Sequence, residues 1–568
     1  MRWQILPHEE AAEPLARALG CHPLVAQILW RRGLRDPEVA AAFLDSRLRD
    51  LPDPASLAGI EPAVRRLAHA LVEDEPITAF GDYDVDGVSS TALLVSFLRA
   101  CGARRVDYVL PHRLRDGYGL GAEAVRRLAE RGTRLLVTLD CGVTNVAEIE
   151  EAVARGMDVI VVDHHQTPAD LPPAAAILNP WQPGCRYPTR ELAAVGVTFL
   201  LCAGLRRFLR ERGWFGTRPE PDLREWLDLV ALGTVADVVP LVGTNRILVR
   251  AGLERLGRPR RPGLRALKRV AGLEPDAAVT AAQVGHRLAP RINAAGRLDD
   301  AATAVELLLS EDPLRAEALA RTLDAANAKR QAIERTILDE AAAQAASQNG
   351  NSVVVAGEGW HPGVVGIVAA RLVERFRKPA VVIGVDPETG VGRGSGRSIG
   401  DFDLHDALKR CADHLLGYGG HKAAAGLTIA REAIASFAAQ LSRVAEERFD
   451  PAQAQPVCVV DGVVRPEDLD EPLCLELERL GPFGAGNAEP VLALLGASVR
   501  GRVVGATPTN PGHLKLQLDA APFVDAIGFG MGERLPELRD RVDLAFHLEM
   551  NEFRGIRRPQ LRLRALRT

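Results

Sequence analysis

The sequence predicts a multidomain α/β protein: a domain with a mostly parallel sheet, a long connecting helix, a second and smaller α/β domain, and a C-terminal β-barrel. Three observations lead to this prediction. Between residues 76 and 178, short apolar runs alternate with amphipathic segments, which is typical of parallel strands joined by crossover helices. Residues 301–348 are rich in alanine and contain few helix breakers, as in a long helix. Residues 457–568 hold short alternating runs separated by turn residues, a pattern that suits a small barrel.

Changes in composition predict where these parts begin and end. A proline-containing stretch at residues 50–60 separates helix-like sequence from the first strand-like run. "QNGN" ends the alanine-rich helix, and "DPAQAQP" has the composition of a linker. The expected parts are an N-terminal helical segment at 1–72, a first α/β domain at 73–300, the connecting helix at 301–348, a second α/β domain at 349–449, and the barrel at 457–568.

Length and composition are those of a globular protein with several domains. A chain of 568 residues corresponds to about three or four domains. The formal net charge of -4 excludes a uniformly basic nucleic-acid coat but leaves room for a local basic groove. The eight cysteines include no CxxC pair, so we expect reduced thiols in a cytoplasmic protein and no structural zinc. No apolar run reaches the roughly 18 residues of a membrane helix.

Acidic and histidine side chains follow the predicted strands at the points where the strands end. Because the carboxyl ends of neighbouring parallel strands converge on one crevice, we expect these side chains to meet there. Helix N-capping is the alternative for each acid taken alone. The side chains are Asp82, Asp84 and Asp86 after the run at 76–80, Asp140 after 134–139, Asp163, His164 and His165 after 158–162, and Asp237 after the apolar stretch at 227–236.

The first of these segments, "GDYDVDG" at residues 81–87, also fits the opening of an EF-hand calcium loop. The twelfth position of such a loop brings a bidentate glutamate, but here it is Leu93. The preceding run at 76–80 is short, apolar and strand-like rather than helical. We therefore expect no calcium loop. Carboxylates combined with imidazole suit manganese or magnesium, and so many acids suggest two ions, roughly 3.5–4 Å apart, as in enzymes that hydrolyse phosphate esters.

The acidic motifs also resemble those of a known family. "GDYDVDG", "LDCG", "VDHH" and "GTVADVVP", in that order, resemble the four motifs of the DHH phosphoesterase superfamily. Further segments are similar to those of the RecJ family of single-strand-specific exonucleases, so the resemblance covers nearly the whole chain and implies DHH, DHHA1-type and OB-fold domains. These segments are "PHRLRDGYGL" (111–120), "RINAAGRL" (291–298), "NAKRQAIE" (327–334), "WHPGVVGIVAARL" (360–372), "GSGRS" (394–398), "YGGHKAAAG" (418–426) and "GPFGAGN" (481–487).

The resemblance implies a role for each residue that follows a strand. His165 would face the scissile phosphate and offset charge in the transition state. Asp163 would orient the two histidines. A buried, hydrogen-bonded structural role is the alternative for each histidine separately. The implied metal ligands are Asp84, Asp86, Asp140 as the bridging carboxylate, His164 and Asp237, with Asp82 either contacting an ion or lying directly beside its ligands.

Two further segments could hold a nucleic acid. Arg291 and Arg297 flank Asn293 and small residues, and such arginines can bind consecutive phosphates; an ordinary surface turn is the alternative, and the resemblance favours DNA.

In the second segment, "VGRGSGRSIG" (391–400), Ser395, Gly396 and Arg397 would form an anion cradle with exposed backbone amides. The resemblance implies that this loop binds the DNA end. His421, in "YGGHKAAAG", would lie beside the substrate or be structural.

The same glycine-rich stretch allows a serine-hydrolase interpretation. Gly396, Ser398 and Gly400 match the G-x-S-x-G nucleophile elbow, with His421 downstream. The elbow requires a strand that runs directly into the serine, and we expect a polar loop there instead. This alternative is therefore discounted.

The resemblance implies an exonuclease that removes nucleotides from the 5′ end of single-stranded DNA, in recombination and repair, with two Mn²⁺ or Mg²⁺ ions. The arginine-rich C-terminal strands would follow the single strand. A helicase and a single-strand-binding protein are the implied partners, and a monomer is expected. The alternatives are a DHH enzyme for short oligonucleotides or cyclic dinucleotides, which generally lacks the barrel, and a replication scaffold without catalysis, against which the complete ligand set argues.

Overall fold

The computed structural model describes the chain except residues 1, 114, 508–509 and 554–555. The first α/β unit is built on a sheet with the order β3-β2-β4-β5-β6, in which every neighbouring pair is parallel. The predicted parallel sheet is confirmed. β2 and β4 are buried along their whole length, as expected for strands covered on both faces. The strands are β2 (Ile77–Gly81), β3 (Val106–Val109), β4 (Leu135–Leu139), β5 (Asp158–Val162) and β6 (Ala176–Leu178).

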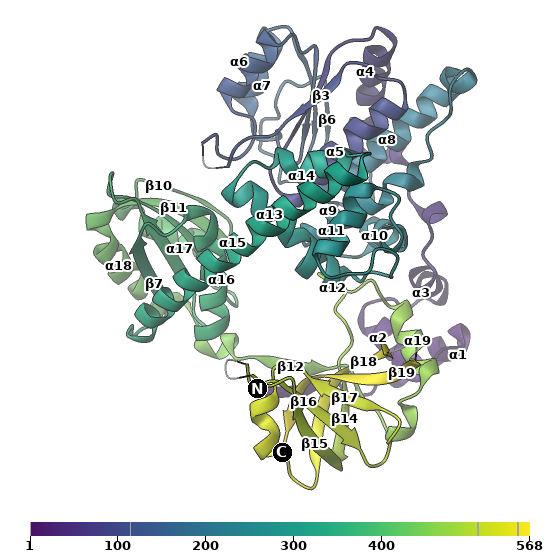
Figure 1. Cartoon of the computed structure of the whole chain (residues 1–568), viewed down its shortest axis with the longest axis vertical. Helices are drawn as coiled ribbons and strands as arrows, with labels where there is room; N and C mark the ends of the chain where they lie inside the picture. Colours follow the sequence, from purple (N-terminus) through teal and green to yellow (C-terminus); the bar gives the residue numbers. More distant parts are fainter. Residues whose placement is uncertain (1, 114, 508–509, 554–555) are drawn as a thin grey trace.

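Helices cover both faces of this sheet (Figure 1). Side chains of α4, α5 and α8 share a core with one face, and side chains of α6 and α7 share a core with the other. The alternation of strands and helices places all the strand ends that carry acids at the same edge. These helices are α4 (Ile60–Val72), α5 (Val85–Ala100), α6 (Ala122–Glu130), α7 (Val146–Ala154) and α8 (Ala194–Glu211).

A layer of helices connects the first unit to the second. The predicted helix over 301–348 is divided into α14 and the 34-residue α15. The division has a local cause, because Asp312 caps α15 through the N–H of Leu314 and Pro313 occupies its first turn. The helices are α9 (Leu227–Ala236), α10 (Gly243–Gly257), α11 (Pro262–Val270), α12 (Ala281–Gln283) with a π-helical turn at Val284–Leu288, α13 (Ala289–Leu298), α14 (Ala302–Leu309) and α15 (Pro313–Ala346).

The second α/β unit is a mixed sheet with the order β10-β11-β9-β8-β7. Only β7 and β8 are parallel; the other neighbouring pairs among these described strands are antiparallel. α16 packs on one face with the end of α15, and α17 and α18 pack on the other. The elements are β7 (Val353–Glu358), α16 (Pro362–Phe376), β8 (Ala380–Val385), β9 (Val391–Arg397), α17 (Leu404–Arg410), β10 (Gly417–Gly420), β11 (Ala424–Ala430) and α18 (Ile434–Arg448).

The C-terminal unit is rich in strands, as predicted. Its sheet has the order β13-β14-β18-β19-β17-β16-β15. Within the described residues no pairing joins the edge strands β13 and β15, so the expected barrel is not closed; β13 is only two residues long and offers few groups for closure. The elements are β12 (Val457–Val460), β13 (Gly462–Val463), α19 (Glu471–Arg479), β14 (Leu492–Ala497), β15 (Val499–Val504), β16 (His513–Leu518), β17 (Asp525–Gly528), β18 (Val542–Phe553) and β19 (Ile556–Arg567).

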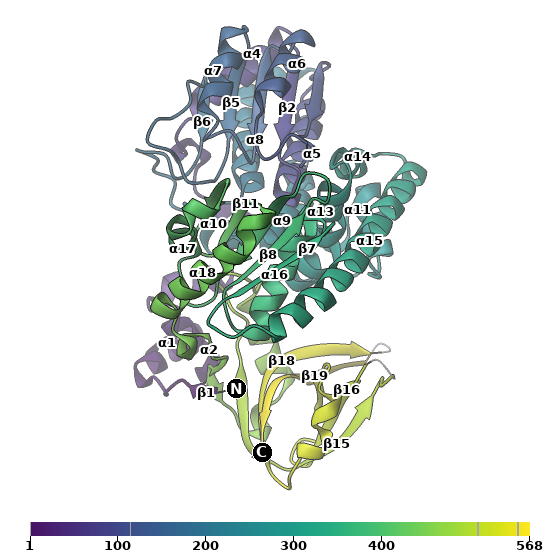
Figure 2. The ribbon, with the colours of Figure 1, turned by 90° about the vertical axis from the view of Figure 1, so that its left-hand side faces the viewer.

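The N-terminal segment contains helices, as expected for 1–72, but it does not form one helical unit. It begins with a strand, β1, which pairs in parallel with β12 from the far end of the chain. α1, α2 and α3 share a core with the C-terminal unit, whereas α4 belongs to the first unit. Figures 1 and 2 show the two ends of the chain close together. These elements are β1 (Arg2–Ile5), α1 (Glu13–Leu19), α2 (Pro23–Arg31) and α3 (Pro37–Leu44).

In the described part of the chain, every helix is too short or too polar to cross a membrane.

Candidate metal centre and nucleic-acid surface

The loop after β2 is shaped by the start of a helix. Asp84 is the N-cap of α5, and its Oδ1 accepts hydrogen bonds from the backbone N–H groups of Asp86 (2.8 Å) and Gly87 (3.1 Å). A Cβ at Gly87 would lie 2.5 Å from Asp82 O, so the turn requires glycine. Helix capping and metal binding are compatible here, because both capping bonds end on Oδ1 and leave the lone pairs of Oδ2 for another partner.

Asp86 is oriented by a second helix. Its carboxylate oxygens accept hydrogen bonds from the backbone N–H groups of Ala194 (2.6 Å) and Val195 (2.9 Å) at the start of α8. A helix N-terminus favours a negative charge. The carboxylate is therefore held in one orientation and keeps lone pairs for a further partner.

Asp140 adopts a strained backbone conformation directly after β4. Its φ is 65°, in the left-handed region that non-glycine residues rarely adopt. Its backbone N–H donates to Val162 O (2.9 Å), which continues the pairing with β5. Strain of this kind is concentrated at functional sites.

Asp163 uses both carboxylate oxygens to hold the histidines and the neighbouring loop. Its Oδ1 lies 2.8 Å from His165 Nδ1 and accepts the backbone N–H groups of His164 (2.7 Å) and His165 (3.1 Å). Its Oδ2 accepts the N–H of Val143 (3.0 Å). This geometry is that of an orienting residue, the role expected for Asp163.

The structure brings the remaining acids and histidines together at the carboxyl edge of the sheet. His164 Nε2 lies 3.3 Å from Asp140 Oδ1 and 3.5 Å from Asp237 Oδ2. Three groups have ligand atoms within 4.8 Å of one another: Asp82, Asp84 and Asp140; Asp86, His164 and Asp237; and Asp140, His164 and His165.

Buried atoms without partners test whether these residues fit a metal. Within the described residues, four buried atoms of this cluster have no hydrogen-bond partner: Asp82 Oδ1, Asp140 Oδ1, His164 Nε2 and Asp237 Oδ2. A buried polar atom without a partner is costly, and divalent cations would satisfy all four. Oxygen ligands with one imidazole nitrogen suit Mn²⁺ or Mg²⁺. The residues therefore fit the expected ions.

Burial and like charge shift the acid–base equilibria of the carboxyl groups. Burial and then the charge of Asp84 raise the pKa of Asp82 to about 8 and that of Asp86 to about 7. Burial and then Asp86 raise the pKa of Asp237 to about 9. Burial and the surrounding aspartates also hold the pKa of Asp140 well above its usual value. So many buried carboxylates can be ionised together only when positive charge lies among them.

The two histidines are shifted in opposite directions. Burial and then the charge of His165 lower the pKa of His164 to about 4, so its ring is neutral and its Nε2 can act as a ligand. Burial opposes the charged form of His165, but the hydrogen bond and the charge of Asp163 outweigh it and raise the pKa of His165 to about 9. The raised pKa favours the charged form of His165 in the metal-free protein.

Tyr118 is a residue of this site that the sequence argument missed. Its hydroxyl donates to the backbone carbonyl of Asp140 (3.0 Å) and lies 3.2 Å from His165 Nδ1. The two rings meet edge to face, with centroids 5.7 Å apart. Tyr118 lies in the segment 111–120, so the resemblance contained the information needed to find it.

Arg291 does not join the other predicted DNA contacts. Its Nε pairs with Asp324 (2.9 Å) and its other nitrogens donate to the backbone carbonyls of Arg287 (2.6 Å) and Val270 (3.2 Å). The guanidinium is thus occupied by contacts within the helical layer. These contacts tie α13 to α15, and the role of Arg291 as a DNA contact stays a prediction.

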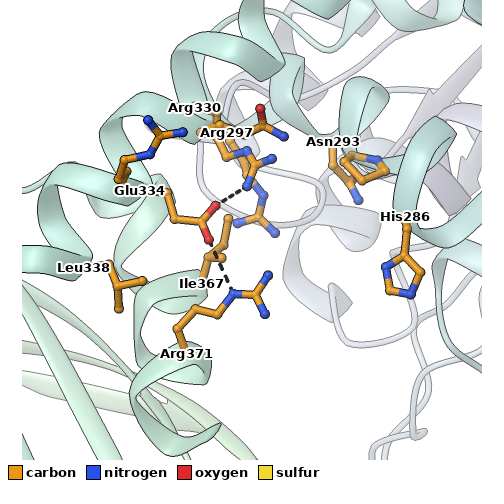
Figure 3. Close-up of a pocket in the computed structure, with 11 residues that line it drawn as sticks. His286, Asn293, Arg297, Arg330, Glu334, Leu338, Ile367 and Arg371 are labelled. Carbon is orange, nitrogen blue, oxygen red and sulfur yellow. Dashed lines mark hydrogen bonds and ion pairs between the residues drawn. The ribbon is translucent and has the colours of Figure 1, made fainter. Parts of the chain in front are cut away.

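Asn293 and Arg297 line a cavity of about 640 Å³ between α13, α15 and α16 (Figure 3). Glu334 lies in its wall and forms ion pairs with Arg330 and, at 3.6 Å, with Arg371. The additional basic residues of the wall were not predicted from the sequence, although Arg330 and Arg371 lie in segments that resemble those of the RecJ family. They are His286, Arg330, Arg335 and Arg371.

Arg297 connects this cavity to the metal centre. Burial and the nearby guanidinium of Arg113 lower the pKa of Arg297 to about 10. α13 packs directly against the loop after β2, because a Cβ at Gly296 would lie only 2.5 Å from Tyr83 O. Arg113 in turn lies over the ring of Tyr83, 4.9 Å from its centroid. Several guanidinium groups with few acids beside them form a surface suited to phosphates.

The structure corrects the anion cradle predicted at residues 391–400. Residues 391–397 form β9, which pairs with β8 on one side and β11 on the other. A central strand has its amides engaged in the sheet, so the exposed backbone amides expected around Gly396 do not exist. A Cβ at Gly394 or Gly396 would lie 2.8 Å from a leucine of the core, which explains the glycines by packing.

The side chains of β9 can still contact an anion, although its backbone amides cannot. Ser395 and Arg397 lie on the face opposite these glycines, against Gly366 of α16. Arg397 Nη1 donates to Ser395 Oγ (3.0 Å). An anion at this place would be held by a hydroxyl and a guanidinium rather than by a nest of amides.

The serine-hydrolase alternative receives no support from the environment of Ser398. Contrary to expectation, a strand does run into this serine. However, Ser398 Oγ donates to Phe402 O (2.5 Å), and among the described residues no histidine is bonded to it. His421 lies exposed in the turn between β10 and β11, where its N–H donates to Ala424 O (2.8 Å).

Three family models match the chain. The DHH family, N-terminal domain, matches residues 76–234, the DHHA1 domain matches residues 349–447, and the RecJ OB domain matches residues 460–565. The resemblance found in the motifs is therefore confirmed.

Curated relatives extend this likeness over nearly the whole chain. The single-stranded-DNA-specific exonuclease RecJ of Dickeya dadantii is 40% identical over 556 residues, which cover 95% of each chain. That of Escherichia coli is 38% identical over 557 residues, again covering 95% of each. That of Bacillus subtilis is 38% identical over 571 residues, covering 99% of this chain and 70% of the relative.

Solved structures agree with these matches. RecJ from Thermus thermophilus in complex with Mn²⁺ has a TM-score of 0.84 and 33% identity, covering all of this chain and 79% of that one. An exonuclease RecJ bound to manganese has a TM-score of 0.60 and 38% identity, covering 70% of this chain and 96% of that one. With shared domains, shared fold and this degree of identity along its length, the chain belongs to the RecJ family of the DHH superfamily.

Proposed function

We propose that this chain is a metal-dependent exonuclease that removes nucleotides from the 5′ end of single-stranded DNA, in recombination and repair. The observation that carries the proposal is the convergence of four buried ligand atoms without partners, on Asp82, Asp140, His164 and Asp237. The names of the relatives as single-stranded-DNA-specific exonucleases support the substrate.

The residue groups suggest how two divalent ions are shared. Mn²⁺ or Mg²⁺ is supported by the ligand chemistry and by the Thermus thermophilus relatives solved in complex with each. Such ions activate water as the nucleophile and offset the charge that develops on the phosphate. One ion would be held by Asp82, Asp84 and Asp140, the other by Asp86, His164 and Asp237, with Asp140 close enough to His164 to serve both groups.

His165 would act on the phosphate itself. As an imidazolium it can donate a hydrogen bond to a phosphate oxygen and stabilise the charge that increases in the transition state. Asp163 fixes the ring through Nδ1 at 2.8 Å, and Tyr118 contacts the same nitrogen at 3.2 Å. This double contact would keep the ring in place while the substrate binds.

The basic cavity and β9 would hold the strand. Asn293 and Arg297 belong to α13, which packs against the loop after β2, and Arg330, Arg335 and Arg371 supply further charge. We keep Ser395 and Arg397 as DNA contacts through their side chains, and His421 as a contact at the edge of the same sheet. Arg291 stays a predicted DNA contact, whereas the amide of Gly396 is engaged in the sheet.

The wider organisation is also a proposal. We propose the functional division 73–300, 349–449 and 457–568 for the catalytic, substrate-binding and OB domains, with α15 as the connector. We also propose a monomer that works with a helicase and a single-strand-binding protein. A cytoplasmic location is in keeping with the eight free cysteines.

A digestion experiment tests the proposed function. End-labelled single strands and duplexes are treated with the parent protein, Asp140→Asn and Asp158→Asn, with Mn²⁺ or with EDTA. Asp158 is the matched control, because it lies at the opposite end of β5 and pairs with Arg66 (2.6 Å). We expect the parent and the control to shorten single strands from the 5′ end only with Mn²⁺, and Asp140→Asn to be slower by more than about 10²-fold.

Cleavage in EDTA, or equal rates for the parent and Asp140→Asn, would contradict the proposal. A dinucleotide cleaved faster than a long single strand would favour the short-substrate alternative, against which the match to the RecJ OB domain at 460–565 argues.

A further inference from the structure

The segment 481–487, "GPFGAGN", has no place in the chemistry proposed above, yet it touches the metal-binding part of the chain. It forms a tight turn in the C-terminal unit, with paired backbone hydrogen bonds between Gly484 and Asn487 (3.0 and 3.1 Å). The backbone carbonyl of Ala485, at the tip of this turn, accepts the N–H of Leu241 (2.8 Å). Leu241 lies in the loop that joins α9 to α10, residues 237–242.

Glycines in the turn allow it to come this close. Gly486 has φ 67°, and a Cβ there would lie 2.8 Å from Pro240 Cβ and 3.2 Å from Pro240 Cα. A Cβ at Gly484 would lie 2.8 Å from Leu241 Cδ1. The turn and the α9–α10 loop are therefore packed against each other without room for a side chain.

The base of the turn is fixed to α10. Arg246, which is 1% exposed, donates from Nη1 to Leu480 O (2.8 Å) and from Nη2 to Arg479 O (2.9 Å). Asn487, also buried, donates to Leu480 O (2.9 Å) and Pro482 O (2.8 Å). The turn is thus a rigid element anchored at one end and pressed on the α9–α10 loop at the other.

Asp237, at the start of that loop, depends on the backbone for its position. It follows the last residue of α9, and its N–H donates to Gly233 O (3.0 Å). Its Oδ2 is buried and has no hydrogen-bond partner among the described residues. The next residue, Val238, has φ 63°, a strained conformation for a β-branched side chain. Strained backbone persists only where its surroundings enforce it.

We propose that the 481–487 turn of the C-terminal unit is a positioning element for Asp237, holding the α9–α10 loop so that this carboxylate reaches the second metal group. The inference rests on the proposed function, since it assigns a metal to Asp237. The turn contacts Pro240 and Leu241, which follow Asp237 by three and four residues. The group of Asp82, Asp84 and Asp140 stands on β2, α5 and β4 and does not depend on the turn.

The test uses full-length, metal-free protein and Mn²⁺ alone. Gly486→Ala places a Cβ against Pro240. Gly530→Ala is the matched control in the same unit, because Gly530 has φ 69° but nothing within 4 Å of its Cβ position. Mn²⁺ binding is measured by calorimetry, and thermal unfolding is measured without metal. We expect two ions on the parent and on Gly530→Ala, and at least a tenfold loss of affinity for one ion only on Gly486→Ala.

Each outcome bears on one of the two claims. A parent protein that binds no Mn²⁺ overturns the proposed function. A parent that binds two ions, with Gly486→Ala indistinguishable from Gly530→Ala, overturns the positioning role alone. If Gly486→Ala does not fold, Gly484→Ala, which meets only the flexible end of Leu241, supplies the same comparison. Loss of both ions in a folded variant would also contradict the claim, because the first group should be retained.

Discussion

At the scale of single residues, the metal centre combines burial with like charge. Asp82 and Asp140 are 3% and 2% exposed, and neither is paired with a lysine or arginine at salt-bridge distance within the described residues. Removing carboxylates from water without a partner raises their pKa values. Without cations, the buried carboxylates of the site therefore lack partners for their charge. The pH dependence of stability should then change when metal binds.

Metal-free protein should lose stability as the pH rises. The pKa values of Asp82 and Asp237 are raised to about 8 and about 9 in the folded state, above the unfolded value of about 3.9. Between these values the folded state binds more protons than the unfolded state, so the free energy of unfolding falls with increasing pH. In EDTA, we expect the melting temperature to fall from about pH 5 to pH 9.

Mn²⁺ should reverse this fall, adding about 2.7 kcal/mol at a hundred times its dissociation constant. Asp140→Asn should flatten the pH dependence in EDTA, because it removes one of the repelling carboxyl groups. Differential scanning calorimetry across this pH range checks both expectations. A metal-free melting temperature that rises toward pH 9 would show that the raised pKa values are wrong.

His165 should affect the chemical step more than metal binding. A neutral amide in His165→Gln can still occupy the space but cannot carry the positive charge that Asp163 stabilises in the imidazolium. We expect the single-turnover rate to fall by about 10²–10³-fold, with Mn²⁺ affinity changed far less. His69→Gln on α4, an exposed histidine away from the crevice, is the control. Equal losses in rate and metal affinity would instead make His165 a ligand.

At the scale of secondary-structure elements, α15 brings basic residues to one side of the cavity. Arg330 on this helix and Arg371 of α16 both line the cavity (Figure 3). Arg335, also on α15, is a further lining residue. Such a surface is difficult to recognise in the sequence, because the same helix carries many other charged residues that pair with each other. Arg321, for example, pairs with Glu317 (3.2 Å).

Arg335 and Arg321 offer a matched test of this surface. Both are exposed on α15, but only Arg335 lines the cavity. We expect Arg335→Gln to weaken binding of a long single strand and to reduce the slope of log affinity against log salt by about 0.7, the loss of one phosphate contact. Arg321→Gln should leave both unchanged. Fluorescence anisotropy at several salt concentrations, with catalysis prevented by EDTA, gives the slopes; identical slopes would remove the cavity from the DNA path.

At the scale of the whole molecule, the two ends of the chain build one unit. β1 pairs with β12, and the core of the C-terminal unit includes Leu15, Leu24 and Ile28 from the first helices. Arg246 joins this unit to α10 through three backbone carbonyls, adding Phe43 O (3.2 Å) to those of Arg479 and Leu480. A buried charge satisfied in this way ties the units together.

Arg246→Met should therefore weaken the docking of the C-terminal unit. The variant removes the donors to Phe43 O and Arg479 O and one of the two donors to Leu480 O. We expect a loss of about 3 kcal/mol in the free energy of unfolding. Calorimetry should show a separate, earlier transition for this unit. Arg207→Met, an exposed arginine on α8, is the control. A single transition at the parent's temperature would show that Arg246 contributes little to docking.

Much of the candidate site could be predicted from the sequence because its residues follow strands. The order of apolar runs placed Asp84, Asp140, His164 and Asp237 at strand or helix ends, and a parallel sheet brings such ends to one edge. The motifs then supplied the family. Local sequence was sufficient for these positions because topology, rather than fine packing, decides where they meet.

Other features emerged only when the chain was folded. The glycine-rich stretch at 391–397 is a central strand, because it pairs with β8 on one side and β11 on the other. Its glycines are explained by the core of the second unit, which has no room for a Cβ there. Arg291 forms an ion pair with Asp324. The segment 1–72 is divided between two units. The order of residues was enough to establish the fold class and the family, and to name the acids and histidines of the candidate metal centre. Two things depended on long-range packing: which arginines line a cavity, and which distant segments contact one another. Local sequence carries no periodic pattern for either.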